Sequence, residues 1–152
     1  MKEENLTIVK EASAAFSHNN IPRLLEKLAE DVDWMIAGPQ SILPYAGEHH
    51  GRQQVAASVA AWHQAEEIEA FEPKNFISDG DVVIVLGTYR AIIKSTRRLL
   101  NIQWAHVYTI RGGKIIRFRG FFDTFAASES YTRPVMRAAA GSGRAWGTPR
   151  LL

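Results

Sequence analysis

One histidine stands among aromatic and aliphatic residues in the segment NIQWAHVYTIRGGKIIRFRGFFD, residues 101–123. The segment contains two extended runs, 102–110 and 114–123, joined by a glycine-containing turn, and this pattern predicts a β-hairpin. Because side chains alternate along a strand, Trp104, His106 and Tyr108 share one face. An imidazole titrates near neutral pH, so His106 could exchange a proton with a ligand or donate a hydrogen bond to its carbonyl oxygen.

The lengths of the two hairpin turns predict which residues lie opposite His106 and which share its face of the sheet. A three-residue loop at 111–113 pairs Ile110 with Lys114 and places His106 opposite Phe118. The same register puts Ile116 on the histidine's face. In the preceding hairpin, a two-residue turn at 96–97 places Tyr89 opposite Trp104, again on this face. Gly87 and Gly120 lie mid-strand, where a sheet bends or leaves room for a ligand.

Two interpretations of His106 remain open. In one it is a catalytic residue, kept neutral because burial lowers its pKa. In the other it is a core histidine bonded to Tyr89, Tyr108 or a backbone carbonyl. Five aromatic residues are predicted to pack on a flat apolar ligand, although aromatics at such spacings also form plain core: Trp34, Trp62, Trp104, Phe118 and Phe122. Tyr89 and Tyr108 could donate a hydrogen bond to a ligand oxygen, and Tyr45 could close over the pocket or pack on the sheet.

The elements that position these residues follow from periodicity. Helices are predicted over residues 3–18 and 53–67, with a short helix after Asn20, which can cap it. Strands are predicted over 32–37, 68–78 and 82–94, ahead of the hairpin, while 40–52 forms a structured loop and 124–130 a helical turn. The order predicts an α+β domain with helices on one face of a curved, mostly antiparallel sheet.

Several charged groups are better explained by exposure to solvent or by ion pairing than by catalysis or metal binding. Four acids, Glu66, Glu67, Glu69 and Glu72, are predicted to form a solvated face, and Asp123 could pair with Arg119. His49 and His50 adjoin Glu48, but neighbouring loop residues seldom point at one ion, so no metal is expected. The chain has no glycine-rich phosphate loop or dinucleotide fingerprint, and no cofactor is expected.

Composition describes an ordinary globular protein. The 152 residues are 46% hydrophobic and 22% charged, which suits one domain, and the absence of cysteine excludes disulfides. The basic end divides the chain into a domain, 1–130, and a mobile tail, 131–152. The net charge of +2 comes from that tail, so no nucleic-acid partner is expected. Neither a signal peptide nor a membrane-spanning stretch is evident, which predicts a cytoplasmic protein without membrane contact.

Between residues 3 and 127 the chain resembles the SnoaL-like branch of the ketosteroid isomerase and nuclear transport factor 2 superfamily. The resemblance lies in NNIPRLLEKLAEDVDWMIAGP, LPYAGEHHGRQQV, DVVIVLGTYR and QWAHVYTIRGGKIIRFRGFFD. It implies a cone-shaped, cystatin-like α+β barrel, whose strongly curved sheet and three helices enclose a pocket for a hydrophobic small molecule. Such proteins are usually homodimers. They include isomerases, polyketide cyclases and proteins without catalysis, so the fold alone does not define the function.

The family's functional residues match this chain poorly. The tyrosine of the first helix in ketosteroid isomerases corresponds to Ala12 or Ser13, and the aspartate base corresponds to Ile36. Their second aspartate corresponds to His106, and the acid on the last strand of SnoaL-like cyclases to Gly120. Two functions stay open. The first is a cofactor-independent isomerase, cyclase or lyase that uses His106 on a carbonyl-bearing ligand, and the second is a non-catalytic ligand-binding or dimerisation module.

Overall fold

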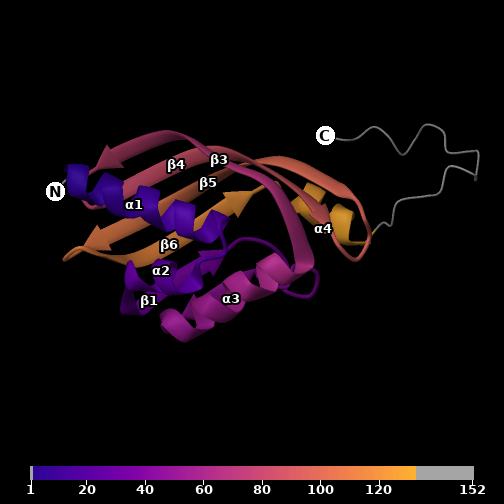
Figure 1. Ribbon diagram of the computed structural model, residues 1–152, viewed down its shortest axis with the longest axis horizontal. Helices are drawn as coiled ribbons and strands as arrows, with labels where there is room; N and C mark the ends of the chain where they lie inside the picture. Colours follow the sequence, from indigo (N-terminus) through magenta and orange to yellow (C-terminus); the bar gives the residue numbers. More distant parts are fainter. Residues whose placement is uncertain (1, 133–152) are drawn as a thin grey trace, which may run out of the picture.

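The computed structural model describes residues 2–132, which form one sheet with helices packed against it (Figure 1). Helix α1, Lys2–Ser17, lies along strands β3 and β4, and α3, Gly51–Ala65, lies along β1. The short α2, Ile21–Glu26, begins at Asn20, whose side chain accepts a hydrogen bond from the Arg23 amide as predicted. Helix α4, Thr124–Thr132, follows the last strand and packs beside β5.

Six strands form the sheet in the order β2-β1-β6-β5-β4-β3. They are β1 (Leu28–Ile36), β2 (Gly47–His50), β3 (Glu66–Asp79), β4 (Val82–Ile93), β5 (Leu99–Arg111) and β6 (Lys114–Phe122). The predicted antiparallel run from β3 to β6 is confirmed. Strand β1 pairs in parallel with β6, and β2 forms an edge where the sequence predicted only a loop.

The β5–β6 hairpin has a shorter turn than predicted. Gly112 and Gly113 both have positive φ, 61° and 78°, and Arg111 pairs with Lys114. Two left-handed residues form the tight turn that matches strand twist. An irregularity beside Thr109 then shifts the pairing, so His106 lies opposite Gly120 rather than Phe118. The residues predicted to share the sheet face of His106 do share it, with one exception. Ile115 is buried on that face, and Ile116, which was predicted there, is partly exposed.

The β4–β5 hairpin has a longer turn than predicted. The Ile93 amide donates to the Arg98 carbonyl, which leaves four residues, 94–97, in the turn. Tyr89 therefore lies opposite Ile102, and Trp104 lies opposite Gly87. The displacement is again two residues, so Tyr89 and Trp104 keep their predicted face.

The core lies between the helices and the sheet face that carries His106. Alternate residues of β1, β4 and β5 are buried, as the period of two predicts. Among residues 2–132, no helix is long and apolar enough to span a membrane. Helix α4 includes the first two residues of the predicted tail, and the rest of that tail, 133–152, lies outside the described residues.

Candidate functional site

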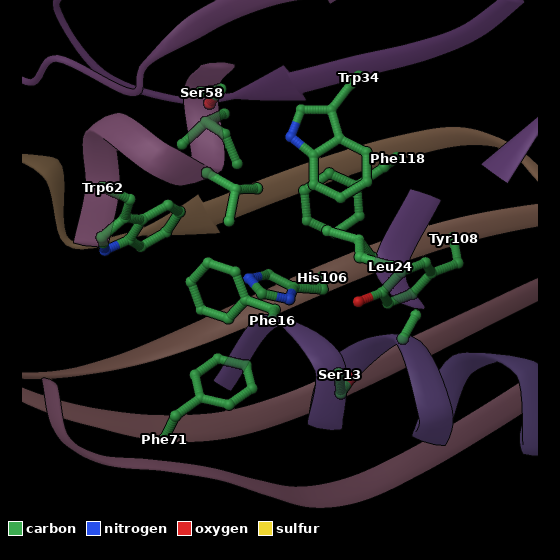
Figure 2. Close-up of a pocket in the computed structure, with 13 residues that line it drawn as sticks. Ser13, Phe16, Leu24, Trp34, Ser58, Trp62, Phe71, His106, Tyr108 and Phe118 are labelled. Carbon is green, nitrogen blue, oxygen red and sulfur yellow. The ribbon is translucent and has the colours of Figure 1, made fainter. Parts of the chain in front are cut away.

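Side chains from helices and strands enclose a small cavity in the core (Figure 2). The cavity has a volume of about 20 Å³, which is room for about one water molecule. Its lining is apolar except for a few polar groups, and thirteen of the residues that the structure describes contribute to it. They are Ala12, Ser13, Phe16, Leu24, Trp34, Ile36, Ser58, Val59, Trp62, Phe71, His106, Tyr108 and Phe118.

His106 lies at the centre of this lining, between aromatic rings (Figure 2). Its ring is 4.1 Å from that of Trp104 and 4.9 Å from that of Phe118, centroid to centroid. The side chain is 7% exposed, and its Nδ1 has no hydrogen-bond partner among residues 2–132. Burial lowers the pKa of His106 to about 3, so the imidazole is neutral at physiological pH.

A serine and a tyrosine add polarity near His106. The buried hydroxyl of Ser13, on α1, lies beside the Tyr108 phenol, yet it meets no partner at hydrogen-bonding geometry within the described part of the chain. Burial raises the pKa of Tyr108 to about 12, so its hydroxyl stays protonated. The cavity wall therefore offers neutral groups that can donate and accept hydrogen bonds, and no charge.

The predicted ligand-binding aromatics divide into two groups. Trp34, Trp62, Tyr108 and Phe118 line the cavity with His106. The other four do not line it, and each packs behind the lining or beside it. Tyr45 stacks on Trp62 at 4.0 Å, Trp104 stacks on Phe71 at 4.7 Å, Tyr89 donates to Glu66, and Phe122 lies 6.3 Å from Tyr45.

Glu66 is buried, so the predicted solvated acidic face is wrong for this residue and holds only for Glu67, Glu69 and Glu72. Its Oε1 accepts hydrogen bonds from Tyr89 Oη at 2.5 Å and from Trp62 Nε1 at 3.2 Å. Its Oε2 accepts from Tyr131 Oη at 2.6 Å. Burial nevertheless raises the pKa of Glu66 above that of a free carboxyl group.

The hydrogen bonds of Glu66 fix one wall of the cavity. The Trp62 indole nitrogen points away from the cavity (Figure 2). It donates to Glu66 Oε1 and to the Tyr89 hydroxyl oxygen, which lies 2.9 Å away. Tyr45 covers the ring on one side. Trp62 is thereby held both by hydrogen bonds and by stacking, and Tyr131 joins α4 to the same carboxylate.

The predicted charge pair between Asp123 and Arg119 is wrong. Arg119 pairs with Asp33 across β1 and β6, with Nη2 and Oδ2 3.0 Å apart, and this pairing replaces the predicted one with Asp123. Asp123 instead accepts a hydrogen bond from the Ala126 amide at the start of α4. The His49 ring bonds the Tyr45 carbonyl at 3.0 Å, while His50 is exposed.

Sequence reasoning missed several lining residues, Phe16, Phe71, Ser58 and the unpaired Ser13 hydroxyl among them. Helical spacing places Phe16 on the apolar side of the helix over residues 3–18, but no sequence signal indicates that this side borders a cavity. A small polar residue next to that stripe, as Ser13 is, was the available signal for a polar group facing inward.

Comparisons with known proteins agree on the fold. The SnoaL-like domain model matches residues 9–118. An NTF2-like protein from Burkholderia xenovorans LB400 is 33% identical, with 86% of this chain and 98% of that one covered and a TM-score of 0.78. An uncharacterized protein from Mycobacterium tuberculosis H37Rv is 27% identical over 132 residues, 85% of this chain and 96% of that protein. TerC, crystallized with polyporic acid, is 23% identical, covers 85% and 98%, and has a TM-score of 0.73.

Proposed function

Because the chain belongs to the SnoaL-like domain family, we propose that it binds a small, mostly apolar molecule in the cavity around His106. The ligand carries one oxygen, as a carbonyl or hydroxyl group, that hydrogen-bonds His106. Apolar lining with few polar groups is the usual composition of such sites. TerC, which has this fold, was co-crystallized with an organic molecule, polyporic acid.

The unpaired Nδ1 of His106 is the observation that carries the proposal. A buried polar atom without a partner costs about 1–3 kcal/mol, so native proteins seldom keep one without a reason. His106 and Ser13 both line the cavity, and within residues 2–132 the Ser13 hydroxyl also has no partner at hydrogen-bonding geometry. A ligand oxygen placed there would satisfy groups that the protein itself leaves unsatisfied.

The low pKa of His106 favours binding over proton abstraction. A general base works best when its pKa is near the operating pH. With the pKa lowered to about 3, the imidazole is a weak proton acceptor at neutral pH, although it still donates or accepts a hydrogen bond. We therefore assign His106 to orienting and polarising the ligand, and keep isomerase, cyclase or lyase activity as the second function, tested by the effect of His106→Phe on turnover.

Phenol and toluene test the proposed contact because they differ by a hydroxyl in place of a methyl group. We expect the ratio of phenol to toluene affinity to fall about tenfold in His106→Phe, the equivalent of about 1.4 kcal/mol for one lost hydrogen bond. NMR titrations of both proteins measure the two affinities, and in the wild type the His106 ring resonances should move with phenol. An unchanged ratio, or no phenol binding, would contradict the proposal.

Self-association through the outer sheet face is also part of this proposal. Leu86, Ala105 and Phe121 form a row across β4, β5 and β6, and Leu86 and Phe121 are 38% and 45% exposed. Apolar side chains grouped on one face suit an isologous contact with a second copy. We expect light scattering to give a dimer at micromolar concentration and a monomer for Phe121→Asp. Phe125→Asp, at an exposed position on α4, is the control, and a monomeric wild type would refute the dimer.

A further inference from the structure

One lining residue differs from the rest in its exposure. All but one of the thirteen side chains around the cavity are buried, and the exception is Phe71, on β3, which is partly exposed. The phenyl ring lies at the margin of the cluster, next to Phe16 (Figure 2). Phe71 is therefore the most solvent-exposed of the residues that line the cavity.

The strand that carries Phe71, β3, is one of the two edge strands of the sheet and pairs only with β4. Its register shifts on both sides of Phe71, between Ile68 and Ala70 and between Pro73 and Asn75. Each shift interrupts the ladder of hydrogen bonds, and Pro73 has no amide hydrogen to donate. A short strand segment between two irregularities can move more easily than the strands inside the sheet.

The Phe71 ring packs against other aromatic rings. It stacks on Trp104 with the ring planes 1° apart, and it meets Phe16 edge-on at 5.1 Å. No hydrogen bond fixes it, because a phenyl ring has no polar atom. Trp62, across the cavity, is instead bonded to Glu66 and Tyr89. Of these two rings in the wall, Phe71 is therefore the one that can turn outward without breaking a hydrogen bond.

The size of the cavity requires such a movement. In the closed arrangement it holds about one water molecule, which is too little for any ring-sized ligand. Turning Phe71 outward vacates the volume of one benzene ring next to His106. We infer that Phe71 is the gate of this cavity and that its outward rotation sets both the rate of ligand binding and the largest ligand accepted. This inference rests on the proposed binding function.

Binding kinetics test the gate. We expect Phe71→Ala to raise both the association and the dissociation rate of phenol by about tenfold or more, because the open state of a closed gate is a minor population. The dissociation constant should change much less than either rate. The variant should also bind 2-naphthol, a larger phenol, more tightly than the wild type does. NMR relaxation dispersion during phenol titrations gives the rates, and Phe71→Leu supplies a milder variant with intermediate rates.

Phe76→Ala is the matched control. Phe76 is also a partly exposed phenylalanine of β3, with the Lys10 ammonium group 5.2 Å from its ring centre, but it does not line the cavity. Its replacement should leave both rates within about twofold of the wild type, since it is no part of the gate. If both rates in Phe71→Ala equal those in Phe76→Ala, or if only the dissociation rate rises, Phe71 is not the gate. Phenol binding, and with it the proposed function, is unaffected by that outcome. Absence of phenol binding from the wild type and every variant would overturn the proposed function and the gate together.

Discussion

Replacing Glu66 by alanine is expected to lower the free energy of unfolding by about 3–5 kcal/mol, because it leaves buried hydrogen-bond donors without an acceptor. The donors are the Trp62 indole and the hydroxyls of Tyr89 and Tyr131. Urea denaturation followed by circular dichroism measures the change. Glu67→Ala, next to it on β3 and exposed, should cost less than about 0.5 kcal/mol. Equal stability of the two variants would show that the Glu66 hydrogen bonds contribute little.

Glu66→Gln separates the charge from the hydrogen bonds. Since burial raises the pKa of Glu66, the folded protein holds this proton more tightly than the unfolded chain does. The contribution of protonated Glu66 to stability is therefore complete at pH values below the pKa of a free carboxyl group. It decreases as the pH rises through the raised pKa that Glu66 has in the folded protein. Glutamine does not titrate, so the stability of the wild type relative to Glu66→Gln should fall with rising pH. If the stability of the wild type relative to Glu66→Gln instead increases with pH, the pKa of Glu66 is lowered in the folded protein.

Gly87→Ala is expected to destabilise the protein by about 3 kcal/mol, at the upper end of the range for overpacked cores. A Cβ at this position would fall well inside contact distance of the Trp104 ring and of the Glu72 carbonyl oxygen. One of these is backbone, and the other is a large ring stacked on Phe71 and close to His106. Neither can move away freely, so the change should also disturb the cavity.

Gly120→Ala is the matched comparison, because it also lies mid-strand on the cavity side of the sheet. Its Cβ would meet side-chain atoms of Ile36 and Phe118 at 3.2 Å, and these side chains can shift slightly. We expect a cost of less than about 1.5 kcal/mol. Thermal or urea unfolding compares the two variants, and the His106 ring resonances report displacement of Trp104. Similar stabilities would contradict the assigned role of Gly87.

The faces of the strands in both hairpins could be predicted from the sequence, although the register of the strand pairs could not. Both hairpin registers differ from the prediction by two residues. Turn length depends on backbone geometry that the residues 94–97 and 111–113 do not define alone, and in the β5–β6 hairpin the irregularity beside Thr109 supplies one of the two residues. A displacement of two preserves the alternation, so His106 and Tyr108 still point inward. Gly87, predicted to leave room for a bend or a ligand, leaves room for Trp104 of the chain itself.

Glu66 shows where a pattern was misinterpreted. Grouping it with three nearby acids suggested a solvated face, but it also follows Trp62 by four residues. On a helix that spacing continues the buried side formed by Val55, Val59 and Trp62. The phenols that satisfy the carboxylate come from β4 and α4, and no local signal reveals contacts so distant along the chain.

The parallel pairing of β1 with β6 has a consequence for biosynthesis. Trp34 lies beside Phe118, and both line the cavity, although one belongs to the first strand and the other to the last. A nascent chain cannot form this contact until β6 has left the ribosome, and closing so long a loop slows folding. The wall of the cavity is thus among the last parts of the molecule to assemble.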